Sequence, residues 1–167
     1  MIGLPVAAAV RRPSALLVDD RPANLLALEA LLAPLEARLV QASSGEEALA
    51  RLAADEFALV VLDVQMPGLD GLETLARLRA RERGVKTPAL FVTAGAPDPS
   101  RVERAYQLGA VDFIPKPLDA NALRAKVAVF LELYEAREEV RRHAAVLRAR
   151  DLADSERKYR FLADATP

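Results

Sequence analysis

The sequence predicts an α/β fold: a doubly wound parallel sheet of five strands, followed by a long carboxyl-terminal helix. Short apolar segments alternate with amphipathic segments five times between residue 15 and about residue 118. The connections are short, which is typical of parallel strands joined by helices on both faces of a sheet. Residues 119–163 contain no proline or glycine and are dominated by alanine, leucine, glutamate and arginine, which favour a helix.

The clearest of the expected strands is Leu59-Val60-Val61-Leu62, which leads directly into Asp63. An unbroken run of aliphatic and β-branched residues is the pattern of a strand that is buried on both faces. The other strands are shorter or less apolar, and they are placed mainly by the alternation. The five strands are expected at residues 15–19, 38–42, 58–62, 88–93 and 111–114.

The helices between these strands carry their own start signals. Pro22 suits the first turn of a helix, where its missing N–H costs nothing. Ser44 and Glu47 are three residues apart and form a capping box. A third helix is expected to open near Gly71, and the fourth begins at Asp98, an N-cap followed by proline.

Composition excludes several classes of function. The formal net charge of -1 gives no overall field that would attract nucleic acid. The absence of cysteine excludes disulfides, thiol catalysis and thiolate metal sites. No apolar run approaches the roughly 18 residues of a membrane helix. Residues 1–13 are expected to form an amino-terminal arm, because the basic pair Arg11-Arg12 follows the apolar stretch instead of preceding it as in a signal peptide. A cytoplasmic location fits these features.

Residues 119–163 are expected to form one helix of about 45 residues, roughly 65 Å long. Its first turns can pack on the sheet, but a small domain is too narrow for the rest. Leu133, Val140 and Leu147 repeat every seven residues, as in a coiled-coil seam. A lone helix of this kind buries little apolar surface, so a parallel dimeric coiled coil is expected. A solvated helix with scattered aliphatic residues is the alternative.

Charged residues stand at the carboxyl ends of three expected strands, where open α/β sheets place their ligands. Asp19 and Asp20 end the first strand, Asp63 ends the third, and Lys116 follows the fifth between two prolines that fix the local chain. Carboxylate oxygens suit Mg²⁺, and an ammonium suits a phosphoryl group. The expected site therefore holds a divalent cation and a phosphoryl group, although the carboxylates taken alone could be solvated loop residues.

Thr93 ends the fourth expected strand and is followed by small residues, Ala94, Gly95 and Ala96. Its hydroxyl can donate to a phosphoryl oxygen, and the small residues leave space for such a group. The alternative is that Thr93 is an ordinary strand-end residue.

These residues closely resemble the receiver domain of two-component response regulators. The resemblance covers about residues 14–133 and implies a flavodoxin-like sheet with strand order 2-1-3-4-5 and a receiver core at residues 14–118. Its specificity is high, because five separate elements agree in order and spacing. The matching segments are Asp19-Asp20, Asp63, Met66-Pro67-Gly68-Leu69-Asp70-Gly71, Thr93-Ala94 and Lys116-Pro117.

The resemblance implies a role for each site residue. Asp63 would be the phosphoacceptor and would attack a phosphohistidine to form an acyl phosphate. Asp20 would bind Mg²⁺ directly, with Mn²⁺ as an alternative metal, and Asp19 would bind it mostly through water. Asp63 and the backbone carbonyl of Gln65 would complete the protein ligands.

The resemblance also implies how the phosphoryl group is held and sensed. Lys116 would pair with the phosphoryl oxygens, and Thr93 would donate a hydrogen bond to them. Phe113 would be the switch aromatic that packs inward once Thr93 moves. The expected partners are a histidine kinase or phosphotransfer protein and a second copy of the chain, paired through the carboxyl-terminal helix. Neither nucleic acid nor membrane is expected as a partner of this segment.

Residues 155–167 look like the lead-in to a PAS sensory domain, with residues 164–167 as its first part. The parent protein would then be a sensor histidine kinase or a cyclic-nucleotide enzyme with a receiver domain. The alternative is that Thr166-Pro167 is a natural end.

Two other functional classes compete with a phosphorylatable receiver. The first is a magnesium-dependent phosphatase with an aspartate nucleophile, which needs a second acid two residues further on to protonate the leaving group. That position is Gln65 after Asp63 and Arg21 after Asp19, so neither aspartate has the partner. The second is a receiver-like dimerisation module that takes no phosphoryl group, against which the complete set of site residues argues. Self-catalysed phosphotransfer, without enzymatic turnover, is therefore expected for this segment.

Overall fold

The computed structural model describes residues 11–83 and 86–164. Strands and helices alternate as predicted, with bounds that differ from the predicted ones by no more than two residues. The predicted arm at residues 1–13 falls mostly outside the described residues, as do residues 165–167 of the predicted PAS lead-in. The elements are β1 (Ser14–Val18), α1 (Pro22–Leu32), a short 3-10 helix (Ala33–Leu35), β2 (Arg38–Ala42), α2 (Gly45–Ala54), β3 (Leu59–Asp63), α3 (Gly71–Arg81), β4 (Ala89–Ala94), α4 (Pro99–Gln107), β5 (Ala110–Lys116) and α5 (Ala120–Asp164).

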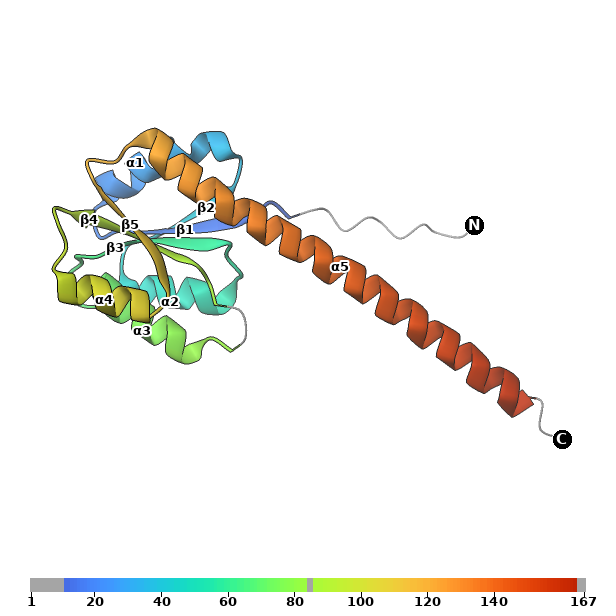
Figure 1. The fold of residues 1–167 in the computed structure, drawn as a ribbon. Helices are drawn as coiled ribbons and strands as arrows, with labels where there is room; N and C mark the ends of the chain where they lie inside the picture. Colours follow the sequence, from blue (N-terminus) through green and yellow to red (C-terminus); the bar gives the residue numbers. More distant parts are fainter. Residues whose placement is uncertain (1–10, 84–85, 165–167) are drawn as a thin grey trace. The chain divides into compact units, whose positions relative to one another are not determined.

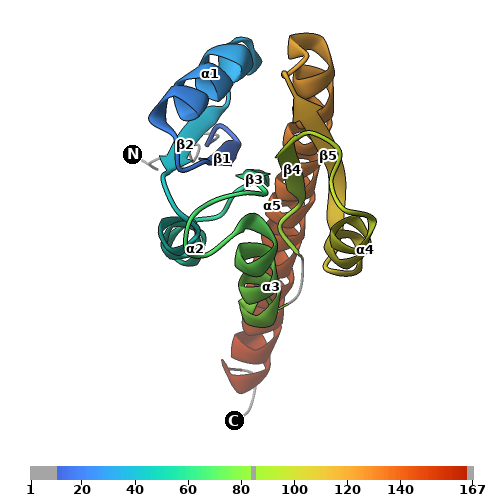
Figure 2. The ribbon, with the colours of Figure 1, turned by 90° about the vertical axis from the view of Figure 1, so that its left-hand side faces the viewer.

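The five strands form one parallel sheet in the order β2-β1-β3-β4-β5, so the predicted fold and strand order are confirmed (Figure 2). The register pairs Val18 of β1 with Leu62 of β3, and Asp63 with Val92 of β4. Parallel strands that share this register end at the same edge of the sheet. Asp19, Asp20, Asp63 and Lys116 lie at this edge, at the carboxyl ends of β1, β3 and β5.

Helices cover both faces of the sheet, with α2, α3 and α4 on one face and α1 on the other (Figure 1). Alternation along each strand supplies a separate apolar layer to each face. The layer under α2, α3 and α4 is a continuous cluster in which Phe91 is the largest fully buried side chain. The other face is covered by buried side chains of α1 and of the first turns of α5, namely Leu25, Leu28, Leu32, Leu123, Val127 and Leu131.

The predicted caps at Ser44 and Asp98 form, but the capping box is incomplete, because the carboxylate of Glu47 accepts from the N–H of Ser43 at 2.8 Å and not from that of Ser44. The side chain of Ser44 accepts a hydrogen bond from the backbone N–H of Glu47 at 3.1 Å. Asp98 accepts one from the N–H of Ser100 at 3.1 Å, and proline follows it at the first helical position. These caps satisfy N–H groups that have no partner within the helix.

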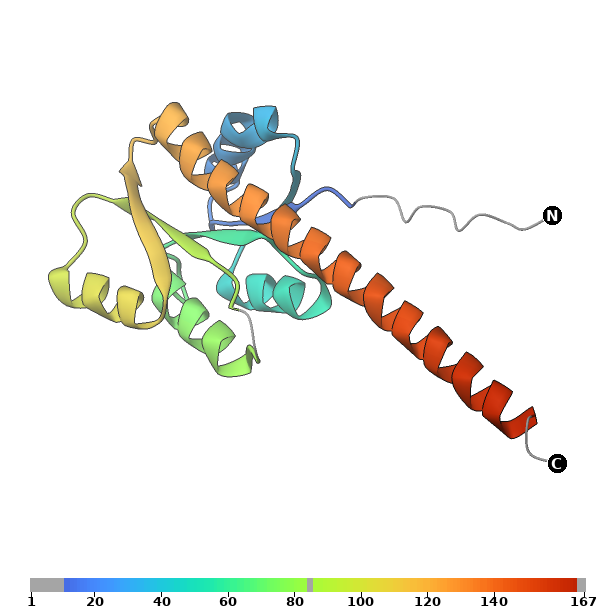
Figure 3. The same cartoon turned by 45° about the vertical axis from the view of Figure 1, so that its right-hand side comes forward.

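The chain divides into two compact units, with the boundary between Leu131 and Glu132. The predicted long helix is confirmed, because α5 is a single helix of 45 residues (Figure 3). Leu133, Val140 and Leu147 are 54%, 69% and 60% exposed in the single chain. Their predicted pairing in a coiled coil stays a prediction. Among the described residues, no helix combines the length and the apolar character needed to span a membrane.

Candidate functional site

Three carboxylates converge at the carboxyl-terminal edge of the sheet. Asp19 and Asp20 follow β1, and Asp63 is the last residue of β3. Because Val18 pairs with Leu62, the next residues along the two strands, Asp19 and Asp63, reach the edge at the same level. One carboxylate oxygen from each of the three residues lies within 4.8 Å of the others. The predicted convergence of acidic groups from the first and third strands is therefore present.

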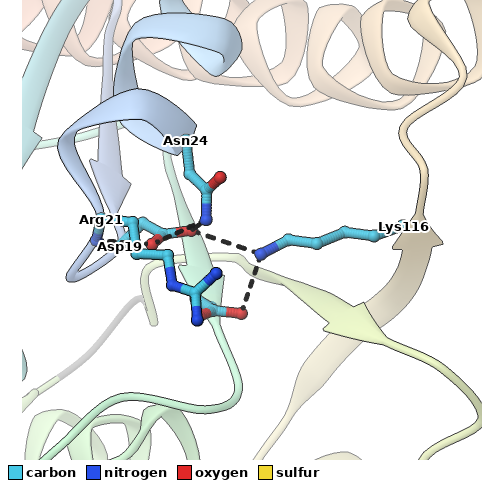
Figure 4. A network of polar contacts seen from close by, with 5 residues as sticks. Asp19, Arg21, Asn24 and Lys116 are labelled. Atoms are coloured by element: carbon cyan, nitrogen blue, oxygen red, sulfur yellow. Dashed lines mark hydrogen bonds and ion pairs between the residues drawn. The ribbon is translucent and has the colours of Figure 1, made fainter.

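Asp19 is the most deeply buried of the three residues, with 1% of its surface exposed. The backbone N–H of Arg21 donates to its Oδ1 at 2.9 Å. The side-chain amide of Asn24 donates to Oδ1 at 3.1 Å and to Oδ2 at 3.0 Å (Figure 4). These donors offset the cost of burying an ionised group and fix the orientation of the carboxylate.

Lys116 reaches the carboxylates from the end of β5. Its Nζ lies 3.5 Å from Oδ2 of Asp19 and 3.5 Å from Oδ1 of Asp63 (Figure 4). The peptide bond between Lys116 and Pro117 is cis. Through its two carboxylate contacts, the ammonium of Lys116 connects residues at the ends of β1 and β3.

The pKa of Asp63 lies above its ordinary value. Burial is the largest cause, since it disfavours the charged form. The ammonium of Lys116 acts in the opposite direction, and the charges of Asp19 and Asp20 raise the pKa further. Burial therefore decides the direction of the shift in the pKa of Asp63, and the attraction of Lys116 does not offset it.

The donor set fits a hard divalent cation. The oxygens of Asp19, Asp20 and Asp63 are close enough to share one ion, and Mg²⁺ prefers carboxylate oxygens together with retained water. A cation here would favour the charged form of Asp63 against its burial and would offset the repulsion from Asp19 and Asp20. Gln65 lies two residues beyond Asp63 and lines the same cavity.

Asp20 and Asp63 open into a cavity of about 560 Å³, and Asp19 is buried behind its lining. The cavity is larger than a single ion needs, and its walls carry positive as well as negative side chains. The space can therefore accept an anionic group beside the acidic cluster. The cavity is lined by Asp20, Arg21, Asn24, Asp63, Val64, Gln65, Met66, Pro67, Asp70, Ala94, Arg101 and Lys116.

Neither Thr93 nor Phe113, the two predicted switch residues, is in the lining of the cavity. Thr93 is only 5% exposed, and Ala94 forms the wall where β4 ends. The ring of Phe113 stacks on that of Phe91 with centroids 5.3 Å apart and forms a T-shaped pair with Tyr106 with centroids 5.7 Å apart. Phe113 is thus already half-buried between two aromatic side chains.

Several cavity residues were not assigned a site role from the sequence. Asn24 follows Asp19 by five residues and lies in the first turn of α1, so its position after the strand was an available signal. The sequence points to Arg21 only as the position where a phosphatase would need an acid. Arg101 gave no local signal, because its partner Asp70 is 31 residues away in the sequence.

Comparison with known proteins identifies the family. The family model of the response regulator receiver domain matches residues 15–128 of the chain. The chain is 37% identical over 117 residues to the sensor histidine kinase GacS of Pseudomonas protegens, which is 68% of this chain and 12% of that protein. It is 32% identical over 139 residues to the cyclic di-GMP phosphodiesterase response regulator RpfG of Xanthomonas campestris pv. campestris, which is 82% of this chain and 36% of that protein.

A solved structure agrees with these relatives. The signal receiver domain of an HD domain-containing protein from Pseudomonas fluorescens superposes with a TM-score of 0.66 at 31% identity, covering 76% of this chain and 99% of that one. The chain spans less than two thirds of the length of both curated relatives. The family match covers most of the chain and includes every strand-end residue of the acidic cavity, and the chain therefore belongs to the response regulator receiver domains of two-component signal transduction.

Proposed function

We propose that Asp63 is the phosphoacceptor of this receiver domain and that its donor is a phosphohistidine of a histidine kinase or phosphotransfer protein. The observation that carries the proposal is the meeting of three carboxylates and one lysine at one edge of the sheet. Membership of the receiver family supports the same assignment.

The proposed step is one transfer between two nucleophiles. A carboxylate oxygen of Asp63 attacks the phosphorus, a P–O bond forms, and the P–N bond to the donor histidine breaks. The imidazole nitrogen keeps the electron pair of that bond and takes a proton. The product is an acyl phosphate on Asp63, and nothing is oxidised or reduced.

The chain's own residues would position and neutralise the reacting groups. Asp19, Asp20, Asp63 and the backbone carbonyl of Gln65 would hold Mg²⁺, for which Mn²⁺ can substitute since it takes the same oxygen ligands. When bound, the metal would supply positive charge at the transferring phosphoryl oxygens. Lys116 would supply a second positive charge to these oxygens. Phosphoryl transfer depends mainly on such positioning and charge neutralisation.

Thr93 and Phe113 would sense the transfer. In this proposal Thr93 moves toward the phosphoryl group to donate a hydrogen bond, and Phe113 follows into the space that it leaves. The stacking of Phe113 on Phe91, whose strand carries Thr93, supports a mechanical link between these side chains.

The output would pass through the long helix. We infer a receiver core at residues 14–118, a helical linker at residues 119–163 and a PAS-like domain beginning near residues 164–167. Leu133, Val140 and Leu147 would form the seam of a homodimer, supported by their heptad spacing and their exposure. A sensor histidine kinase as parent protein is supported by the similarity to GacS.

The phosphoacceptor assignment is tested with beryllofluoride, a mimic of the acyl phosphate, in the presence of Mg²⁺. The wild-type chain and Asp112→Asn should both bind the mimic, because Asp112 lies outside the cavity. Asp63→Asn should not bind it. Phosphorylation with acetyl phosphate should likewise label Asp63, and a label that persists in Asp63→Asn would contradict the assignment.

The dimer is tested separately by sedimentation of the full chain. Val140→Asp would place a charge in the proposed seam and should convert a dimer to a monomer. Ser155→Asp, outside the proposed seam and also exposed, is the matched control. A wild-type chain that stays monomeric at all concentrations would contradict the proposed seam.

A further inference from the structure

Arg101 is a further cation of the cavity, besides Lys116 and Arg21, and it comes from α4. Arg101 lies near the start of that helix, and its side chain lines the same cavity as Asp63 and Lys116. Its Nη2 donates to Oδ2 of Asp70 at 2.9 Å. Asp70 is the N-cap of α3, which lies on the same face of the sheet as α4 (Figure 3). The proposed function gives no role to this ion pair.

The two partners of the pair are held very differently. Oδ1 of Asp70 accepts a hydrogen bond from the N–H of Glu73 at 2.8 Å, so the cap fixes this carboxylate at the start of α3. Arg101 sits at the end of a long side chain that is 38% exposed. Ion pairs with this exposure contribute little to stability, so the guanidinium can leave Asp70 at small cost.

The guanidinium has capacity for a second anion. It carries five N–H donors in a planar fork, and the contact with Asp70 uses one of them. Phosphoryl oxygens match this fork and carry more negative charge than one carboxylate. The ammonium of Lys116 is already shared between Asp19 and Asp63. A phosphoryl group on Asp63 would therefore leave negative charge that an additional cation in the same cavity, such as Arg101, can balance.

We propose that Arg101 binds the phosphoryl group on Asp63, and that Asp70 pairs with the Arg101 guanidinium while Asp63 is unphosphorylated. When Asp63 carries the phosphoryl group, the guanidinium exchanges its contact with Asp70 for contacts with the phosphoryl oxygens. The inference rests on the proposed function, since it needs a phosphoryl group on Asp63. The exchange would break the ion pair between Asp70, the N-cap of α3, and Arg101, near the start of α4. Phosphorylation would therefore change the contact between these two helices.

Beryllofluoride titration at saturating Mg²⁺, followed by the ¹⁹F resonance of the bound mimic, tests the exchange on the full chain. Arg101→Met should weaken binding about tenfold, the usual value of one hydrogen bond to a charged group. Asp70→Asn should tighten it several-fold, because asparagine keeps the helix cap but frees the guanidinium. Arg104→Met, on the same helix but outside the cavity lining, should bind like the wild type.

The opposite signs separate the proposal from a purely structural ion pair. A structural pair predicts that Arg101→Met and Asp70→Asn change affinity in the same direction or not at all, and either result would overturn the inference. Arg101→Lys should give intermediate affinity, and thermal melts confirm that each variant is folded. If the inference alone fails, the wild type still binds the mimic at Asp63. If the wild type does not bind it, the proposed function fails and the inference fails with it.

Discussion

Removing the negative charge of Asp63 should stabilise the metal-free protein. One oxygen of Asp63 lies within 4.8 Å of those of Asp19 and Asp20, and at an effective dielectric constant of about 20 each such repulsion is about 3.5 kcal/mol. The attraction to Lys116 at 3.5 Å is about 5 kcal/mol on the same scale. Repulsion exceeds attraction by about 2 kcal/mol before burial is counted. Burial, the largest cause of the raised pKa of Asp63, acts in the same direction as this repulsion, and the hydrogen bond from Lys116 acts against it.

Asp63→Asn should therefore raise the free energy of unfolding by about 2 kcal/mol near neutral pH without metal, and the melting temperature by about 5 to 10 °C. A carboxyl whose pKa is raised in the folded state contributes stability below its unfolded pKa and loses it as pH rises through the folded pKa. The advantage of Asp63→Asn should accordingly shrink as the pH falls toward the ordinary carboxyl range. Thermal melts monitored by circular dichroism across this pH series measure both effects.

Two controls make the sign of this effect decisive. Asp112→Asn makes the same chemical change where the hydrogen bond from Lys126 lowers the pKa of the carboxyl, so it should reduce stability at neutral pH. Saturating Mg²⁺ should stabilise the wild type more than Asp63→Asn, because the ion cancels the repulsion and binds only the folded cluster. A melting temperature of Asp63→Asn that equals or falls below that of the wild type without metal would refute the electrostatic reasoning.

Three further predictions concern stability and metal binding. Arg79→Met should cost about 3 to 5 kcal/mol, because the 8% exposed Arg79 pairs with Glu82 and donates to two backbone carbonyls. The exposed ion pair of Arg77 is the matched control, and Arg77→Met should cost about 0.5 kcal/mol or less in urea unfolding. Gly71→Ala should lower both stability and Mg²⁺ affinity, because its Cβ would lie 2.2 Å from the backbone oxygen of residue 63, and a calorimetric titration unchanged from wild type would contradict this. Lys116→Met should tighten Mg²⁺ binding by removing a competing cation, and a weaker Mg²⁺ affinity by calorimetry would count against that reasoning.

The sequence alone determined the elements of the fold and the order of the charged residues along it. The run before Asp63 is apolar throughout and becomes a strand with every residue buried. Ser44 and Asp98 start helices because their side chains accept hydrogen bonds from the first turn. Periodicity, capping and helix propensity depend on residues that are close together in the chain, so they can be recognised in the sequence itself. Parallel strands then bring Asp19 and Asp63 to one edge of the sheet.

Only the tertiary structure decided how the side chains share that edge. Asn24 satisfies the buried Asp19, Arg101 meets Asp70 across 31 residues, and Ala94 forms the cavity wall while Thr93 beside it is buried. Each of these contacts depends on how separate helices and strands pack against one another. Local propensity contains no information on that packing. The chemistry of the cavity could therefore be predicted from the strand ends, whereas its complete set of partners required the packed fold.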